Sequence, residues 1–194
     1  MGVPVQPGRH GRRPAAFRAI AGFALAVAGS SALGLVAGLI WGEAAPRAVL
    51  QEIATGTAEL VNEETSAFIG ADALFCVIAA VAGLITGVVG YRFLMARAGS
   101  GARAAAAAGL ILGAVAGALV MLWLGGQIGL SGYNHQLAFS ADGTLFPASL
   151  TLGAKSALAF WPMFTAIVIV VAEWGTRHQD SPPEPLPGYA QPPE

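Results

Sequence analysis

Charged residues are scarce in this 194-residue chain, at 11% of the sequence. A water-soluble domain carries about 25%, so the chain lacks the polar material to cover a surface that faces water. The formal net charge is −1, which argues against nucleic acid as a partner because phosphate binding needs a concentrated basic face. The shortage of charge indicates a membrane protein.

Cysteine is nearly absent as well. Cys76 is the only one, which excludes a disulfide within the chain and the paired-cysteine spacings of zinc sites. Lysine also occurs once, at Lys155, and the other basic residues are arginines. The residue types that remain show no catalytic arrangement and no cofactor-binding motif, so we assign neither catalytic residues nor a cofactor.

Long apolar runs are abundant. A membrane-spanning helix needs about 20 mostly apolar residues, and four stretches meet that length, at residues 17–41, 69–94, 104–124 and 152–174. The first exceeds the ~7–15 residues of a signal-peptide core, so we expect a retained anchor. The predicted organisation is a basic tail at 1–16, one four-span domain at 17–174 and a disordered proline-rich tail at 175–194.

The arginines predict the orientation of the spans, because basic residues near span ends tend to stay in the cytoplasm. Most of them precede span one, separate spans two and three, or follow span four: Arg9, Arg12, Arg13, Arg18, Arg92, Arg97, Arg103 and Arg177. Only Arg47 and Lys155 fall on the other side. We therefore expect a multi-pass protein of the bacterial plasma membrane with both termini in the cytoplasm.

Glycines at four-residue spacing predict where the helices pack, since small residues let helix backbones approach closely in lipid. The rows are Gly34 and Gly38 in span one, Gly83 and Gly87 in span two, and Gly109, Gly113 and Gly117 in span three. We expect spans one to three to pack through these rows, either within one chain or between copies. Pro162, inside span four, predicts a kink or a shorter helix that begins near Trp161.

Two outer segments are also predicted to be ordered. Within residues 42–68, apolar residues recur at helical spacing while Glu52 and Glu59 take other faces, which predicts an amphipathic helical segment. Asp142–Gly143 predicts a short hairpin, whose strand Pro147 would confine to an edge. The predicted fold is therefore an all-α membrane protein, a four-helix transmembrane bundle with an amphipathic outer helical segment and a short outer hairpin.

Asp72 stands at the outer mouth of span two, where the helix dipole favours an anion. Lys155 lies in the same leaflet at the start of span four. We predict that Asp72 and Lys155 approach each other, directly or through Glu64, and join spans two and four; the alternative is two side chains that reach for water and never meet. Glu63, Glu64 and Asp72 could also converge on a hard cation, but no EF-hand spacing supports this, and we assign no metal.

Short motifs carry a resemblance. They are GLIWG at 38–42, IGADALF at 69–75, LILGAVAGAL at 110–119 and AKSALAFWP at 154–162. Over most of residues 19–174 the chain resembles a family of actinobacterial membrane proteins described only as a domain of unknown function, in which arginine is commoner at the position of Lys155. The resemblance implies a four-span envelope protein and brings no catalytic or binding residues.

The function expected from these features is a non-enzymatic envelope scaffold or accessory subunit, embedded in the lipid bilayer and bound to an envelope protein or to copies of itself. A small transporter or channel protomer is the alternative, although that class usually places ionisable groups at mid-span. A membrane enzyme comes third, because the outward-facing acids and His135 form no recognisable arrangement.

Overall fold

The computed structural model describes residues 12–54, 56–61, 66–96 and 98–179. Four long helices dominate it: α1 (Arg12–Ala44), α2 (Ala67–Gly90), α3 (Ser100–Gln127) and α5 (Phe160–Gln179). Each belongs to a helical stretch that is long and apolar enough to cross a membrane. The predicted four-helix transmembrane bundle is confirmed.

The first and last of these helices extend into the predicted tails. α1 begins at Arg12, upstream of residue 17, and α5 continues to Gln179, beyond residue 174. Pro14 fits the first turn of α1, because the first N–H groups of a helix have no intrahelical acceptor. Part of each predicted tail is therefore helical, and residues 1–11 and 180–194 lie outside the described part of the chain.

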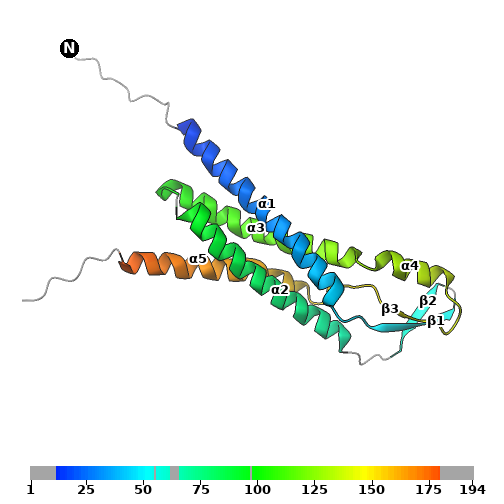
Figure 1. The fold of residues 1–194 in the computed structure, drawn as a ribbon. Coiled ribbons are helices and arrows are strands. Elements are labelled where there is room, and N and C mark those ends of the chain that lie inside the picture. The colour runs from blue at the N-terminus through cyan, green and yellow to red at the C-terminus, as the bar shows by residue number, and fades with distance from the viewer. Residues whose placement is uncertain (1–11, 55, 62–65, 97, 180–194) are drawn as a thin grey trace, which may run out of the picture.

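The bundle has two different ends (Figure 1). α1 begins and α5 ends at one of them, which we call the terminal end. The opposite end, which we call the sheet end, carries a small sheet and the helix α4 (Leu130–Phe139). The sheet and α4 together form a unit beyond the long helices, and we refer to this unit as the head.

Residues 42–68 hold two strands of a three-stranded antiparallel sheet. The amphipathic helical segment predicted for these residues was therefore wrong. The strands are β1 (Val49–Ala54), β2 (Thr57–Leu60) and β3 (Leu145–Pro147), in the order β2-β1-β3. Gly56 adopts φ +80°, which only glycine reaches without strain. The chain therefore turns back on itself, and Leu50 pairs with Leu60 across the two strands.

The structure around Asp142–Gly143 also differs from the predicted hairpin. A turn does form there, with Gly143 at φ +89°, but α4 precedes it instead of a strand. The strand after the turn, β3, pairs with β1, placing Phe146 opposite Leu50. β1 already presents an edge at this point, so β3 completes a sheet and not a hairpin of its own. Pro147 lies in an edge strand, where a missing N–H is tolerated.

Pro162 lies in the first turn of α5. A short 3-10 helix, η3 (Lys155–Ala159), leads into α5. Proline is tolerated at this position, since its missing N–H would have no intrahelical acceptor. Of the two outcomes predicted for Pro162, the structure has the helix that begins near Trp161.

The glycine rows sort the long helices into two pairs. A Cβ placed on Gly34 of α1 would lie 2.5 Å from the carbonyl oxygen of Gly117 in α3. A Cβ placed on Gly83 of α2 would lie 2.5 Å from the carbonyl oxygen of Trp161 in α5. Gly38, Gly109 and Gly113 follow the first pairing, whereas Gly87 follows the second and meets Val168.

The partner of the α2 row therefore differs from the prediction. Spans one to three were expected to pack through their glycines. The glycine row of α2 instead packs against bulky side chains of α5. Phe164 reaches within 3.0 Å of the Cβ position on Gly83. A bulky helix needs a flat surface on its partner to approach closely, so the glycines of α2 are matched to span four.

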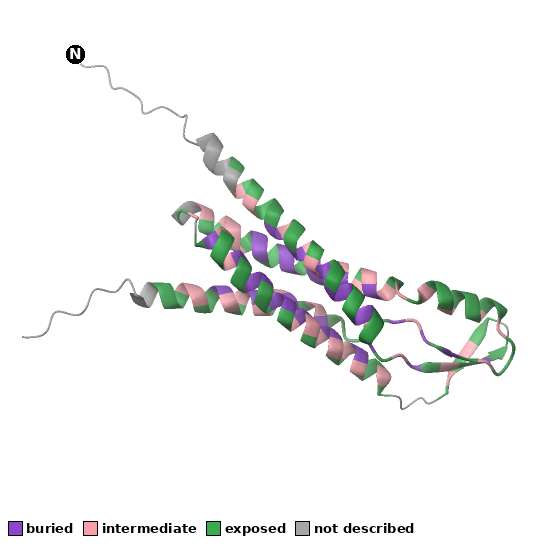
Figure 2. Ribbon diagram, viewed as in Figure 1, coloured by how far each residue is buried: buried purple, intermediate pink, exposed green. Residues whose placement is uncertain are grey.

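Buried positions occur along all four long helices (Figure 2). Small residues fill most of this core, with a few large aromatic side chains between them. Trp41, Phe75 and Trp161 are fully buried, among alanines such as Ala79 and Ala114. The long helices also carry many exposed valine, leucine and isoleucine residues. Small residues inside and bulky apolar residues outside are expected for a bundle in lipid. Helix association in lipid depends on close packing, since burying leucine there gains little.

Candidate functional site at the sheet end

Asp72 joins the second span to the start of the fourth. Its carboxylate accepts hydrogen bonds from the backbone N–H groups of Gly153 (Oδ1, 3.0 Å) and Ala154 (Oδ2, 2.8 Å). These groups stand directly before η3, where backbone donors lack helical acceptors and negative charge is favoured. Asp72 therefore fixes the point at which the chain enters span four.

No direct ion pair joins Asp72 and Lys155, both of which the structure describes. Lys155 is exposed, and the ion pair among the described residues joins a different couple, Arg103 and Glu173. Backbone amides replace the ammonium group because the fold holds them in position, whereas ordering a lysine side chain costs entropy. Glu64, the predicted intermediary, lies outside the described residues.

Arg47 binds the ends of two other spans. Its Nη2 donates to the carbonyl oxygens of Gly42 (2.8 Å) in the last turn of α1 and of Ile128 (3.0 Å), just after α3. Helix C-termini favour a cation because their last carbonyls are unpaired. From the sequence, Arg47 was only one of the few basic residues on the outer side, although its place just after span one was an available signal for this role.

Trp41 connects α1 to α2 beside Asp72. Its indole N–H donates to the carbonyl oxygen of Ala71 at 2.9 Å, and its ring meets the edge of Phe75 with centroids 5.2 Å apart. The side chain is fully buried. With Asp72 and Arg47, Trp41 gives the sheet end a set of specific contacts that tie the helices to one another.

Glu52 is the carboxylate that sequence reasoning misplaced. It was expected on a polar face, but it is 1% exposed. Its Oε1 accepts the N–H of Gly56 at 3.3 Å, while its Oε2 has no hydrogen-bond partner among the described residues. Gly56 also donates to the carbonyl oxygen of Leu137 in α4 at 3.1 Å, so Glu52 lies where the strand turn meets α4.

The metal hypothesis gains no support in the described part of the chain. No group of three or more metal-ligating side chains occurs there, and the carboxylate of Asp72 is occupied by backbone donors. Glu63 and Glu64, the other predicted ligands, lie outside the described residues. His135 is exposed and stacks on Phe139 with centroids 5.1 Å apart.

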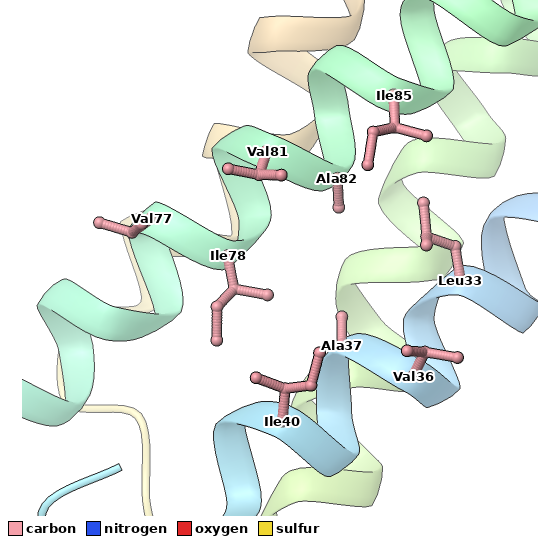
Figure 3. Close-up of a pocket in the computed structure, with 9 residues that line it drawn as sticks. All are labelled: Leu33, Val36, Ala37, Ile40, Val77, Ile78, Val81, Ala82 and Ile85. Carbon is pink, nitrogen blue, oxygen red and sulfur yellow. The ribbon is translucent and has the colours of Figure 1, made fainter. Parts of the chain in front are cut away.

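A groove of about 230 Å³ lies between α1 and α2 in the middle of the bundle (Figure 3). Its lining is entirely aliphatic: Leu33, Val36, Ala37, Ile40, Val77, Ile78, Val81, Ala82 and Ile85. Ile78 and Ala82 point from α2 toward α1. No group there could move a proton or hold a charge, so the groove suits an apolar occupant only.

Together, the fold and these contacts define a four-helix membrane-embedded protein whose sheet end carries a small, firmly attached head. Comparisons with protein-family models, with curated proteins and with solved structures found no match for the chain. The function therefore has to be argued from the geometry.

Proposed function

We propose that the protein is a non-enzymatic scaffold or accessory subunit of a bacterial cell envelope, and that its head binds a protein partner outside the membrane. The arginine distribution supports an external head, because the sheet end is poor in basic residues. The short motifs that resemble an actinobacterial four-span family imply an envelope location, and we include that location in the proposal. The proposal concerns binding, and it assigns no chemical step.

One observation carries the proposal: one face of the sheet exposes three large apolar side chains beside the polar residues Gln51 and Glu59. Val49, Val61 and Leu145 are 48%, 54% and 59% exposed. Val61 donates its N–H to Val49, and Leu145 pairs with Gln51, two positions along β1 from Val49. Side chains at such positions point to one side of a sheet. Exposed apolar side chains bordered by polar ones are typical of a protein-binding site.

The polar contacts at the sheet end support a binding role as well. Asp72 and Arg47 are committed to backbone groups at helix ends, where they hold the segments that lead into and out of the head. A surface that is ordered in advance loses less entropy when a partner binds. These charged groups therefore act as anchors for the head.

The polar side chains buried along the spans are used in packing. Thr86 accepts the indole N–H of Trp161 at 3.1 Å, and Thr165 donates to the carbonyl oxygen of Gly83 at 3.1 Å. A transporter or channel protomer, the alternative expected from the sequence, usually lines its path with ionisable groups. The scaffold proposal is preferred because these hydroxyl groups already have partners within the bundle.

The test is purification of the tagged chain in mild detergent, followed by quantitative mass spectrometry of retained proteins. We expect one stoichiometric partner, lost with Leu145→Glu because a charge in place of an apolar contact cannot be desolvated cheaply. Asn134→Glu is the matched control, since it adds the same charge at an exposed position of α4. That variant should retain the partner.

Two outcomes would contradict the proposal. Retention of the partner by Leu145→Glu would show that the sheet face is not the binding surface. Purification of the chain only with copies of itself, together with solute flux in liposomes that Asp72→Asn abolishes, would instead support the transporter or channel protomer.

A further inference from the structure

Arg92 lies at the terminal end of span two, in a setting unlike that of the other described cations. α2 gives way to a π-helical turn, η2 (Tyr91–Met95), at this point, closed by the N–H of Ala96 on the carbonyl oxygen of Tyr91 at 2.9 Å. Such turns are rare and often occur at functional positions. Arg92 is exposed there.

Arg92 shares a shallow hollow of about 330 Å³ with Val88, Val89 and Phe93. Val88 and Val89 are 50% and 49% exposed. Arg92 forms no ion pair with another described residue, whereas Arg103, at the same end, is paired with Glu173 at 3.9 Å. The hollow therefore presents a guanidinium group that no described carboxylate neutralises, at the border of a row of apolar side chains.

The apolar side chains beside Arg92 continue along α2 toward the groove between α1 and α2. Val81 and Ile85 line that groove (Figure 3), and Val88, Val89 and Arg92 follow at helical spacings of three or four residues, which places them on the same side of α2. A helix rises about 1.5 Å per residue, so Ile85 lies roughly 10 Å and Val81 roughly 16 Å from Arg92 along the axis. The hydrocarbon half-thickness of a bilayer is about 15 Å.

We propose that this side of α2 binds one anionic phospholipid, with its phosphate on Arg92 and an acyl chain in the groove between α1 and α2. A guanidinium matches the geometry and charge of a phosphate. An acyl chain that starts at Arg92 reaches the near half of the groove, whose lining is purely aliphatic. The site combines a headgroup contact and a chain contact, and it does not depend on which side of the membrane the terminal end faces.

The experiment is native mass spectrometry of the full chain in mild detergent, with phosphatidylglycerol or phosphatidylcholine of identical acyl chains added. We expect the wild type to retain phosphatidylglycerol in about fivefold preference, the contribution of one basic residue near an anionic surface. Arg92→Gln should abolish this preference. Lys155→Gln removes an exposed cation at the sheet end, where span four begins. This variant should leave the preference intact.

A second variant tests the chain contact. Val81→Trp places a large ring in the groove from a half-exposed position and should lower the occupancy of phosphatidylglycerol without removing Arg92. Thermal unfolding of each variant checks that it is folded, and either variant can refute the site if the other does not fold. Unchanged lipid preference in folded Arg92→Gln, or unchanged occupancy in folded Val81→Trp, would overturn the proposal.

Discussion

At the scale of single residues, charge at the sheet end serves backbone groups and not other charges. Asp72 accepts two amide N–H groups before η3, and Arg47 donates to two carbonyl oxygens at the ends of α1 and α3. Each charge thus lies at the helix end whose partial charge is opposite to its own. Helix ends near lipid need such partners, because water is less available to satisfy them.

This arrangement predicts the effect of removing the carboxylate of Asp72. Asp72→Ala leaves two N–H groups without their acceptor, and we expect a loss of about 1–2 kcal/mol in the free energy of unfolding, as for a lost helix cap. Asp72→Asn keeps one acceptor oxygen and should lose less. Reversible unfolding in mixed detergent micelles measures these differences.

Lys155→Gln is the control for the ion pair that the sequence suggested. Because Lys155 forms no ion pair with a described residue, its replacement should change the free energy of unfolding by no more than about 0.5 kcal/mol. If Lys155→Gln destabilised the protein as much as Asp72→Ala does, the ammonium group and not the backbone would be the main partner of Asp72.

Sequence reasoning located Asp72 but could not identify its partner. The position of an acid at a span entrance is visible in the sequence, whereas the amides of Gly153 and Ala154 become donors only when span four begins at that place. Glu52 was misplaced for a related reason. Its burial depends on α4 and the strand turn meeting over it, and no local pattern records that contact.

At the scale of elements, the glycine rows set how closely α1 approaches α3. Gly34→Ala would put a Cβ 2.5 Å from the carbonyl oxygen of Gly117, and backbone cannot yield as a flexible side chain can. We expect a loss of about 1–3 kcal/mol, the usual cost of overpacking. The measurement is the free energy of unfolding in mixed micelles.

Gly29→Ala is the matched control in the same helix. Nothing lies within 4 Å of its Cβ position, and alanine is favoured over glycine in a helix by about 1 kcal/mol. This variant should be neutral or slightly more stable. Equal destabilisation by Gly29→Ala and Gly34→Ala would mean that loss of backbone flexibility, and not contact between α1 and α3, determines the effect.

The long helices were predictable and the strands were not, because the two kinds of element depend on different information. A run of about 20 apolar residues leaves few options in lipid, since every backbone group must be paired within the segment. The spacing of apolar residues in β1 and β2 fits either a helix or a strand. The choice depends on Gly56 at positive φ and on β3, which arrives from a distant part of the chain.

At the scale of the whole molecule, two tight helix pairs share a core, and a lateral groove lies between α1 and α2. α1 packs on α3 and α2 packs on α5 through glycine contacts, while aliphatic side chains of α1 and α2 line the open groove. Trp41 connects the pairs near the head through Ala71. At the terminal end the pairs meet again, because Gly90 of α2 lies against Leu110 of α3 and Arg103 of α3 pairs with Glu173 of α5.

The orientation of the whole molecule is the property on which the proposed role of the head depends. The positive-inside rule predicts an external head, and single cysteines introduced into a Cys76→Ala background can test this. Glu59→Cys lies on the exposed side of β2, and Gly99→Cys lies just before α3 with open space around its Cβ. A membrane-impermeant maleimide should label Glu59→Cys in intact cells and Gly99→Cys only after permeabilisation. The reverse pattern would place the head in the cytoplasm, and the partner would then have to be sought there, although the phospholipid site at Arg92 would keep its physical basis.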